Sequence, residues 1–573
     1  MATGRSGCRR FNLAAATGRQ LMRLRFSTPF SALFFALLLA LFSVLSCSAD
    51  IPAGENKPAS VRNIILLIGD GMGPAQFGLL ESYARRAPNS IYQGRPTAVS
   101  QLMQQGKVLL SDTGPHDVLV TDSACSATQL AIGEASGSEM IGLNARGDSV
   151  ETILQKAKRA GMRTGLVSDT RITHATPAAF AAHQPHRRFE NEIAADLLTT
   201  APDLMLSGGL RYFLPQDAAN ISTEQQKQIS AAQLTLKSKR TDQRNLLSEA
   251  QQQGYALAFS REQLAQQQHL PVLGLFASSA MDDAIYASQN PASAQPDLNE
   301  LTRKALQLLG ASEHGFFLMV EGGQIDWAAH NNDAGALLHE LLRFDAAIQE
   351  VVNWAADRDD TLVVLTADHE TGGFGFSYSA HDVPAARTLP GSGMRGQAFA
   401  PNYNFAPLSL LDRLYAQKKG YYRLWADTST DASSDGQKGL PTADSLMAEV
   451  NAALDFPFSR TQAERVLRRD PNPHFDPQTD DPAGATQPHI EDFSDFYVYR
   501  EERYLNALAR ELASAQSVVW STGTHTAAPV PVVISGPEPI LQNFQGFTQH
   551  AKLGHQLKAL IKTDGTGPTE LGD

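Results

Sequence analysis

Residues 63–73 read NIILLIGDGMG, an apolar run that ends in glycines around Asp70. Apolar side chains at consecutive positions predict a strand buried on both faces, as parallel strands are between two layers of helices. Most of the other short runs of this kind precede Gly, Asp or Ser and then helical sequence, and they lie at 118–120, 164–168, 316–320, 361–365 and 530–534. We expect buried parallel strands there, and hence an α/β fold, a three-layer sandwich with a large central, mostly parallel sheet.

Composition excludes several classes of protein. The hydrophobic fraction of 42% and charged fraction of 19% exclude a disordered chain. The formal net charge is −12, and because the first 49 residues hold six arginines and no acid, the remainder is more acidic still. Such a balance argues against a nucleic-acid-binding surface, which needs Lys and Arg to displace counterions. If the chain binds phosphate, metal ions should supply much of the positive charge.

The amino terminus predicts export. The apolar segment 31–45 follows Arg23 and Arg25 and, at 15 residues, is shorter than the ~20 that a membrane span needs. We expect a cleaved signal sequence over residues 1–49, with Met22 as an alternative start, and a periplasmic or extracellular protein. A second interpretation makes Cys47 a lipidated amino terminus, the one case in which the protein would be held at a membrane. Cys125, the one certain thiol of the mature chain, is expected to be a small buried filler.

Polar residues follow the predicted strands, where α/β sheets place their ligands. Asp70 follows the first strand, and taken alone it could be a turn residue or helix cap. Asp122 and Ser123 follow the run at 118–120 and begin a helical segment, so Ser123 would lie where a helix amino terminus favours an anion. An ordinary N-cap has the same pattern. Thr176 before Pro177 also resembles an N-cap, a role that would explain it without any metal.

Carboxylates and histidines complete the set. Asp326 and His330 are four residues apart, so on a helix they share one face and can bind one ion. Asp368 and His369 follow an uninterrupted apolar strand, where such residues need a partner. His525, before the last strand, could be a plain loop histidine. Together with Glu321 and Arg187, which alone would be a solvated charge, these residues predict a hydrolytic metal site.

Six ordered motifs resemble those of the alkaline phosphatases. They lie within residues 60–375 and 518–537 and read IILLIGDGMG, VTDSACSAT, THATPAAFAAHQPHR, VEGGQIDWAAH, TADHETGG and GTHT. The resemblance implies metal-dependent hydrolysis of small phosphate monoesters through a phosphoserine intermediate, in an enzyme that commonly forms a homodimer. A phosphodiesterase of the same superfamily is the alternative, although such enzymes often have a threonine nucleophile and lack the arginine and third metal. A third interpretation is a non-catalytic phosphate-binding protein.

The resemblance also implies residue roles. Ser123 is similar to the nucleophile, Arg187 to the guanidinium that binds two phosphate oxygens, and Asp122 to the residue that orients it. Two zinc ions and one magnesium ion would be bound by Asp326, His330 and His525, by Asp70, Asp368 and His369, and by Asp70, Thr176 and Glu321 respectively. His174 and Trp327 occupy positions near the phosphate and third metal where some family members have Asp and Lys. Without that lysine, phosphate should be held less tightly, and His174 leaves open whether the third metal is zinc or magnesium.

The long separation of the last two motifs predicts an elaboration. We expect one catalytic domain over residues 50–573 with an insertion at about 385–515. That insertion would cover the site, form a dimer contact or bind calcium, with the first two favoured. The Gln-rich stretch 224–268 is expected to be a surface helical insertion without chemistry.

Overall fold

The computed structural model describes residues 61–217, 220–429, 439–473, 475–478, 485–499 and 502–562. The predicted signal sequence over residues 1–49, with Met22 and Cys47, lies outside these ranges. Within them, no helix is both long enough and apolar enough to cross a bilayer. The longest, α14 (Ala334–Ala355), carries Glu340, Arg343 and Asp345 along its length.

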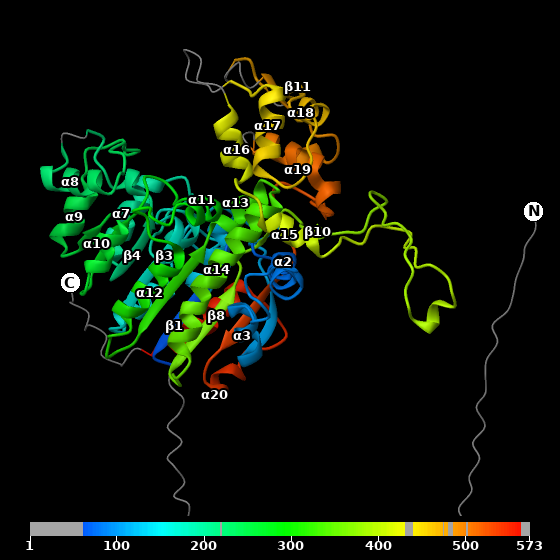
Figure 1. The fold of residues 1–573 in the computed structure, drawn as a ribbon. Coiled ribbons are helices and arrows are strands. Elements are labelled where there is room, and N and C mark those ends of the chain that lie inside the picture. The colour runs from blue at the N-terminus through cyan, green and yellow to red at the C-terminus, as the bar shows by residue number, and fades with distance from the viewer. Residues whose placement is uncertain are drawn as a thin grey trace, which may run out of the picture. The chain divides into compact units, whose positions relative to one another are not determined.

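The centre of the molecule is a ten-stranded sheet (Figure 1). In spatial order its strands are β16 (Phe547–Gln549), β2 (Lys107–Asp112), β15 (Val530–Ser535), β8 (Thr361–Thr366), β1 (Asn63–Gly69), β7 (Phe316–Gly322), β3 (Arg163–Arg171), β4 (Leu204–Gly208), β6 (Val272–Leu275) and β5 (Ala256–Ala258). All neighbours pair in parallel except β15, which is antiparallel to both β2 and β8. The predicted mostly parallel sheet is therefore confirmed.

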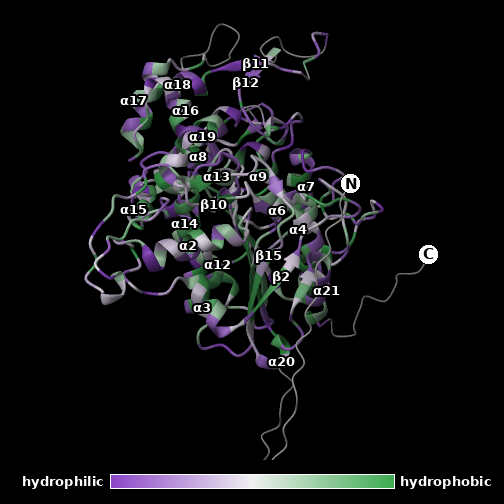
Figure 2. Ribbon diagram, turned by 90° about the vertical axis from the view of Figure 1, so that its right-hand side faces the viewer, coloured by the Kyte–Doolittle hydropathy of each residue, from purple (hydrophilic) through white to green (hydrophobic). Residues whose placement is uncertain are grey.

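Strand β1 shows why the sheet has a layer of helices on each face. Ile65 and Leu67 belong to a core cluster with helices α2 (Pro74–Arg86), α3 (Ala98–Gln105), α12 (Leu298–Leu309) and α14. Ile64, Leu66 and Ile68 point the opposite way, into a second core with α4 (Ser123–Ile132), α5 (Ile153–Arg159), α6 (Ala175–Ala179), α7 (Glu190–Thr200), α9 (Leu246–Gln252) and α21 (His550–Leu560). Because successive side chains of a strand alternate between faces, a strand buried on both must be apolar throughout. Figure 2 shows green at β15, which is buried, and purple at the mostly exposed β11.

Two strand predictions are wrong. Residues 118–120 form no strand, and Val118, Leu119 and Val120 are 50%, 81% and 48% exposed. Three residues are too few to indicate a strand, and the strand that precedes α4 is β2, which ends at Asp112. The run at 530–534 is a strand, but an antiparallel one. Its amino-terminal end therefore lies at the edge where the parallel strands have their carboxyl ends, which brings His525 to that edge.

Long elaborations surround the sheet. Residues 385–515 contain α15 (Ser409–Tyr415), α16 (Tyr421–Thr428), α17 (Ala443–Ala453), α18 (Arg460–Val466), α19 (Arg503–Gln516) and a hairpin of β11 (Arg469–Pro471) and β12 (Thr486–Pro488). Buried residues of these helices, among them Leu424, Val450 and Leu508, continue the core of α14. The Gln-rich stretch 224–268 was expected to be only a surface insertion. It holds α8 (Thr223–Ala231), α9 and α10 (Arg261–Gln266), but Leu246 and Leu247 are buried and β5 is the sheet's edge strand.

Seven further short helices and strands belong to the described fold. They are α11 (Ala284–Gln289), α13 (Gln324–His330), α20 (Glu538–Leu541), β9 (Glu370–Thr371), β10 (Gly375–Phe376), β13 (Val518–Val519) and β14 (His525–Thr526). Of these, α20 follows the carboxyl end of β15 and so lies at the edge opposite the polar residues (Figure 1). Strands β9 and β14 pair antiparallel and place Thr371 opposite His525.

Candidate metal centre

The predicted site residues converge at the carboxyl edge of the central strands. Most lie at the end of a strand or in the helix that follows one, whereas Arg187 lies in a turn and His525 precedes the antiparallel β15. Three groups of side chains place their ligand atoms within 4.8 Å of one another: Asp326, His330 and His525; Asp70, Asp326 and His369; and Asp70, His174 and Glu321. The sequence had assigned Asp368 rather than Asp326 to the second group.

The first group combines one carboxylate and two imidazoles. The Nε2 atoms of His330 and His525 are 3.1 Å apart, and Asp326 Oδ2 is 3.2 Å from His330 Nε2. Each histidine has its Nδ1 against a backbone carbonyl, of Gly523 at 2.7 Å and of Thr121 at 2.8 Å. A neutral imidazole that donates from Nδ1 has a lone pair on Nε2. Two such lone pairs facing each other beside a carboxylate fit a tetrahedral N/O ligand set for zinc.

The pKa values of this group reflect mutual charge stabilisation. Burial alone would lower the pKa of His330, but Asp326 raises it to about 9. Burial would raise the pKa of Asp326, but His330, His525 and His369 hold it well below its usual range. Burial lowers the pKa of His525 to about 4. Without a metal, a proton on His330 would balance the charge of Asp326, a role that a bound cation would otherwise fill.

The second group has more carboxylates, because Asp368 also lies within 3.3 Å of His369 beside Asp70 and Asp326. Asp70 and Asp368 are fully buried, and their Oδ1 and Oδ2 atoms lie 3.4 and 3.3 Å from His369 Nε2. Asp368 Oδ1 accepts hydrogen bonds from the backbone amides of Gly71 and His369, which leaves Oδ2 facing the site. Neither Asp70 oxygen nor Asp368 Oδ2 has a hydrogen-bond partner among the described residues. A turn or cap role for Asp70 is thereby excluded, because its oxygens make no such bond.

The third group contains Asp70, Glu321, His174 and, beside them, Thr176. The sequence suggested Thr176 as an N-cap, but helix α6 begins at Ala175, and His174 precedes it. Thr176 lies inside that helix, and its buried Oγ1 has no hydrogen-bond partner in the described part of the chain, nor has Glu321 Oε1. Burial raises the pKa of Glu321 to about 8. Buried carboxylate and hydroxyl oxygens without hydrogen-bond partners are suitable ligands for a hard cation such as Mg²⁺.

Two hydroxyl groups that the sequence did not single out hold Glu321. Ser168 and Thr170, at the end of β3, both donate to Glu321 Oε2, the latter over 3.1 Å. Thr371 plays a similar part for the first group, since its Oγ1 donates to Asp326 Oδ1 over 2.5 Å. Such bonds from outside a ligand set fix the orientation of the ligands. The only feature of the sequence that indicated these hydroxyl groups was that polar residues follow the apolar residues of a buried strand.

Ser123, at the start of α4, and Arg187, in the turn between α6 and α7, face this centre. Ser123 is the first residue of α4 and nearly fully buried, and its Oγ is 3.2 Å from His369 Nε2. Asp122 caps α4, accepting from the amide of Ala124 over 2.8 Å, and also lies 3.5 Å from Arg187 Nη1. Arg187 Nη2 is 3.1 Å from His174 Nε2. Arg187 is therefore a paired group that points into the site, not a free surface charge.

His174, Trp327 and Cys125 complete the surroundings. The rings of His174 and Trp327 meet edge to face at 5.8 Å. Burial and the charge of Arg187 hold the pKa of His174 well below its usual range, so this imidazole is neutral at physiological pH. Cys125 is fully buried, as expected, and burial raises the pKa of its thiol to about 12.

The insertion contributes contacts to the first group. The Tyr499 ring packs edge-on against His330 at a centroid distance of 4.9 Å, and Asn506 Nδ2 donates to the His330 carbonyl over 2.6 Å. Burial and the charge of Asp326 raise the pKa of Tyr499 to about 12, an effect that Arg187 opposes. No sequence pattern indicated these contacts, because both residues lie far along the chain from His330.

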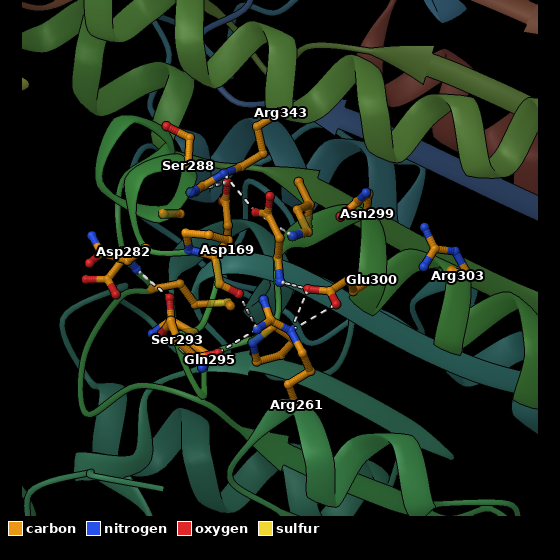
Figure 3. A pocket seen from close by; sticks show the side chains of 17 residues that line it. Asp169, Arg261, Asp282, Ser288, Ser293, Gln295, Asn299, Glu300, Arg303 and Arg343 are labelled. Atoms are coloured by element: carbon orange, nitrogen blue, oxygen red, sulfur yellow. Dashed lines mark hydrogen bonds and ion pairs between the residues drawn. The ribbon is translucent and has the colours of Figure 1, made fainter. Parts of the chain in front are cut away.

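A cavity of about 540 Å³ lies beside Asp169, outside the convergent groups. Figure 3 shows Arg343 pointing toward Asp169 at this cavity. The buried guanidinium of Arg343 is 3.8 Å from Asp169, 3.4 Å from Glu340 and 3.1 Å from Asp297. Asp169 in turn accepts from the amide of Gly323 over 2.7 Å. Arg343 thus places a positive charge beside buried carboxylates, one of which, Asp169, bonds to the chain just after β7, the strand that carries Glu321.

Replacing Arg343 by methionine is expected to lower the free energy of unfolding by about 3 kcal/mol, because Asp169 and Glu340 lose their buried counter-charge. Burial already raises the pKa of Asp169 to about 6 and of Glu340 to about 8. A carboxyl group whose folded pKa is raised favours folding at low pH, and this contribution is lost as pH rises through that pKa. The decrease in the free energy of unfolding caused by R343M should therefore be larger at pH 9 than at pH 5, as measured by denaturant titrations.

Arg303 provides the matched control. It lines the same cavity, but the Arg303 side chain, which pairs with Glu350, is 57% exposed. R303M should lower the free energy of unfolding by less than about 1 kcal/mol at either pH. Equal losses in the two variants would show that Arg343 does not serve as a buried counter-ion.

Comparison with known proteins gives a consistent result. The family model described as "Alkaline phosphatase" matches residues 61–440, more than half of the chain. The chain is 33% identical to alkaline phosphatase 4 of Bacillus subtilis over 328 residues, covering 56% of this chain and 64% of that protein. It is 31% identical to the alkaline phosphatase of Escherichia coli over 356 residues, covering 55% and 71%. The crystal structure of Thermus thermophilus alkaline phosphatase superposes with a TM-score of 0.66 at 24% identity, covering 88% and 94%.

Proposed function

The chain belongs to the alkaline phosphatase family, and on that premise we propose that it hydrolyses phosphate monoesters to an alcohol and inorganic phosphate through a phosphoserine intermediate on Ser123. The observation that carries the proposal is the position of Ser123 Oγ, 3.2 Å from His369 Nε2, where the convergent ligand groups and Arg187 face one point. The buried carboxylate oxygens of Asp70, Asp368 and Glu321 that lack hydrogen-bond partners among the described residues support this proposal, because bound cations would balance their charge.

The donor chemistry suggests which residues would hold each metal. Two zinc ions would be held by Asp326, His330 and His525 and by Asp70, Asp368 and His369, and one magnesium ion by Asp70, Thr176 and Glu321, with His174 close by. When bound, such ions supply the positive charge that lowers the pKa of a serine hydroxyl or a water molecule and stabilises a leaving oxygen.

The protein's own groups would then carry out two in-line displacements. Ser123 Oγ attacks phosphorus, the bond from phosphorus to the ester oxygen breaks, and the alcohol leaves. Water then attacks the phosphoserine and frees phosphate, with net retention at phosphorus. Arg187, oriented by Asp122, donates to two non-bridging oxygens of the phosphoryl group. The amino terminus of α4 adds a favourable field for that anion.

The test is a comparison of a phosphate monoester with its matched diester, both bearing the same chromogenic alcohol. We expect EDTA-sensitive hydrolysis with a kcat/KM at least about a hundredfold higher for the monoester. A monoester has three unesterified oxygens, so two can bind Arg187 while the third faces the proposed cations, whereas a diester has only two and carries one negative charge fewer. Preference for the diester would favour the phosphodiesterase alternative. The Arg187–Asp122 pair and the oxygens of Thr176 and Glu321 count against that alternative.

Other expectations remain proposals. Export to the periplasm or the outside of the cell, and attachment to a membrane through Cys47, concern residues outside the described ranges. A homodimer, small phosphomonoesters as substrates and weaker retention of phosphate beside Trp327 are inferred from the family resemblance alone.

A further inference from the structure

The inserted segment is anchored on both stretches of chain that supply histidines to the first group. The Phe496 carbonyl accepts from Thr522 Oγ1 over 2.9 Å and from the amide of Gly523 over 3.3 Å. Gly523 in turn holds His330 Nδ1 through its carbonyl. Asn506, fully buried on α19, donates to the His330 carbonyl and, over 3.0 Å, to Asn332 Oδ1. Phe496 and Asn506 therefore both bond to the stretches of chain that carry His330 and His525.

Tyr499 is a partly exposed aromatic side chain in contact with the first group. Its ring meets the His330 imidazole at 4.9 Å and 85°, yet the residue is 46% exposed. Its phenol lies within electrostatic reach of Asp326 and of the Arg187–Asp122 pair. By contrast, Tyr497 is buried against Gly523, and the neighbouring Trp425 and Tyr504 stack on each other at 4.6 Å. Those rings serve packing, whereas Tyr499 leaves one side open to solvent beside the site.

We propose that the organic part of the substrate lies against the Tyr499 ring, so that this residue favours aryl over alkyl phosphate monoesters. The inference rests on the proposed function, in which the leaving oxygen of an in-line displacement lies opposite Ser123 Oγ. Because Ser123 stands beside His369, we assign the ester oxygen to the group containing His330, and a substituent on that oxygen extends away from Ser123 toward the Tyr499 ring that contacts His330. An aromatic ring at this position gains an edge or stacking contact with Tyr499 and buries apolar surface from water. A methyl group makes a much smaller contact and buries much less surface.

The test measures binding without turnover. Phenylphosphonate, methylphosphonate and inorganic phosphate are used as competitive inhibitors of the metal-loaded enzyme, since the C–P bonds of the phosphonates resist hydrolysis. In Tyr499→Ala we expect the inhibition constant of phenylphosphonate to rise about five- to tenfold. Those of methylphosphonate and phosphate should change less than about twofold. Tyr499→Phe keeps the ring and should bind all three like the wild type.

Tyr422→Ala is the control, because Tyr422 lies on α16 of the same insertion and is 68% exposed. It should leave all three constants unchanged. A uniform rise of the three constants in Tyr499→Ala, or no rise for phenylphosphonate, would overturn the assignment while leaving the phosphatase function intact. A wild-type enzyme that hydrolyses no monoester would instead refute the proposed function and this assignment with it.

Discussion

Replacing Ser123 by alanine is expected to lower kcat/KM for phosphate monoesters by at least about a thousandfold, because the change removes the oxygen that forms the covalent intermediate. The fold should survive, since the cap of α4 is made by Asp122 and the amide of Ala124, not by the serine hydroxyl. Metal content should also persist, because Ser123 belongs to none of the three convergent groups.

Two measurements separate loss of the nucleophile from general damage. Rapid acid quenching with labelled substrate should trap phosphate on Ser123 of the wild type and none on the variant. Ser136→Ala is the control: Ser136 is also buried, but its hydroxyl donates to the Leu143 carbonyl over 2.8 Å, outside the metal centre. It should keep activity within about threefold of the wild type. Activity above a tenth of the wild-type value in Ser123→Ala would assign the nucleophile to another group.

The strands of the fold were predictable where both faces are buried. Strands β1, β7 and β8 are apolar at most positions, because neither face meets water. Strand β2 escaped prediction because Val108 and Leu110 are exposed and its pattern is that of a half-buried edge region. The antiparallel direction of β15 could not be predicted either, since pairing direction depends on partners distant in sequence.

Site residues were predictable where they are local to a strand end. Asp70, Glu321 and Asp368 each follow a buried strand, and a charge at such a point needs a partner. The supporting residues depend instead on contacts across the fold: Ser168 meets Glu321 from another strand, and Asn506 meets His330 from the insertion. An ordinary serine and an ordinary helical asparagine carry no local signal of such a contact.

Removal of metal by EDTA is expected to abolish hydrolysis and to lower Tm by a margin that grows from pH 7 to pH 9. In the metal-free protein burial raises the pKa of Asp368 to about 7 and of Glu321 to about 8, and Asp326 raises that of His330 to about 9. Groups with raised folded pKa values favour folding below their unfolded pKa, and this contribution is lost as pH rises through the folded value. At pH 9 the metal-free site therefore holds uncompensated carboxylates, which bound cations would neutralise.

Scanning calorimetry of metal-loaded and metal-free protein at the two pH values measures this difference, which should widen by a few degrees, roughly, at pH 9. Proton competition acts in the same direction, because ligands must lose their protons to bind metal, so affinity also rises with pH. Adding zinc and magnesium back should restore both Tm and activity. Ser123→Ala serves as the control: its Tm should respond to EDTA as the wild type does, although it has no activity to lose. Equal Tm values with and without metal at pH 9 would mean that these buried carboxylates hold no cation and that another interaction balances their charge.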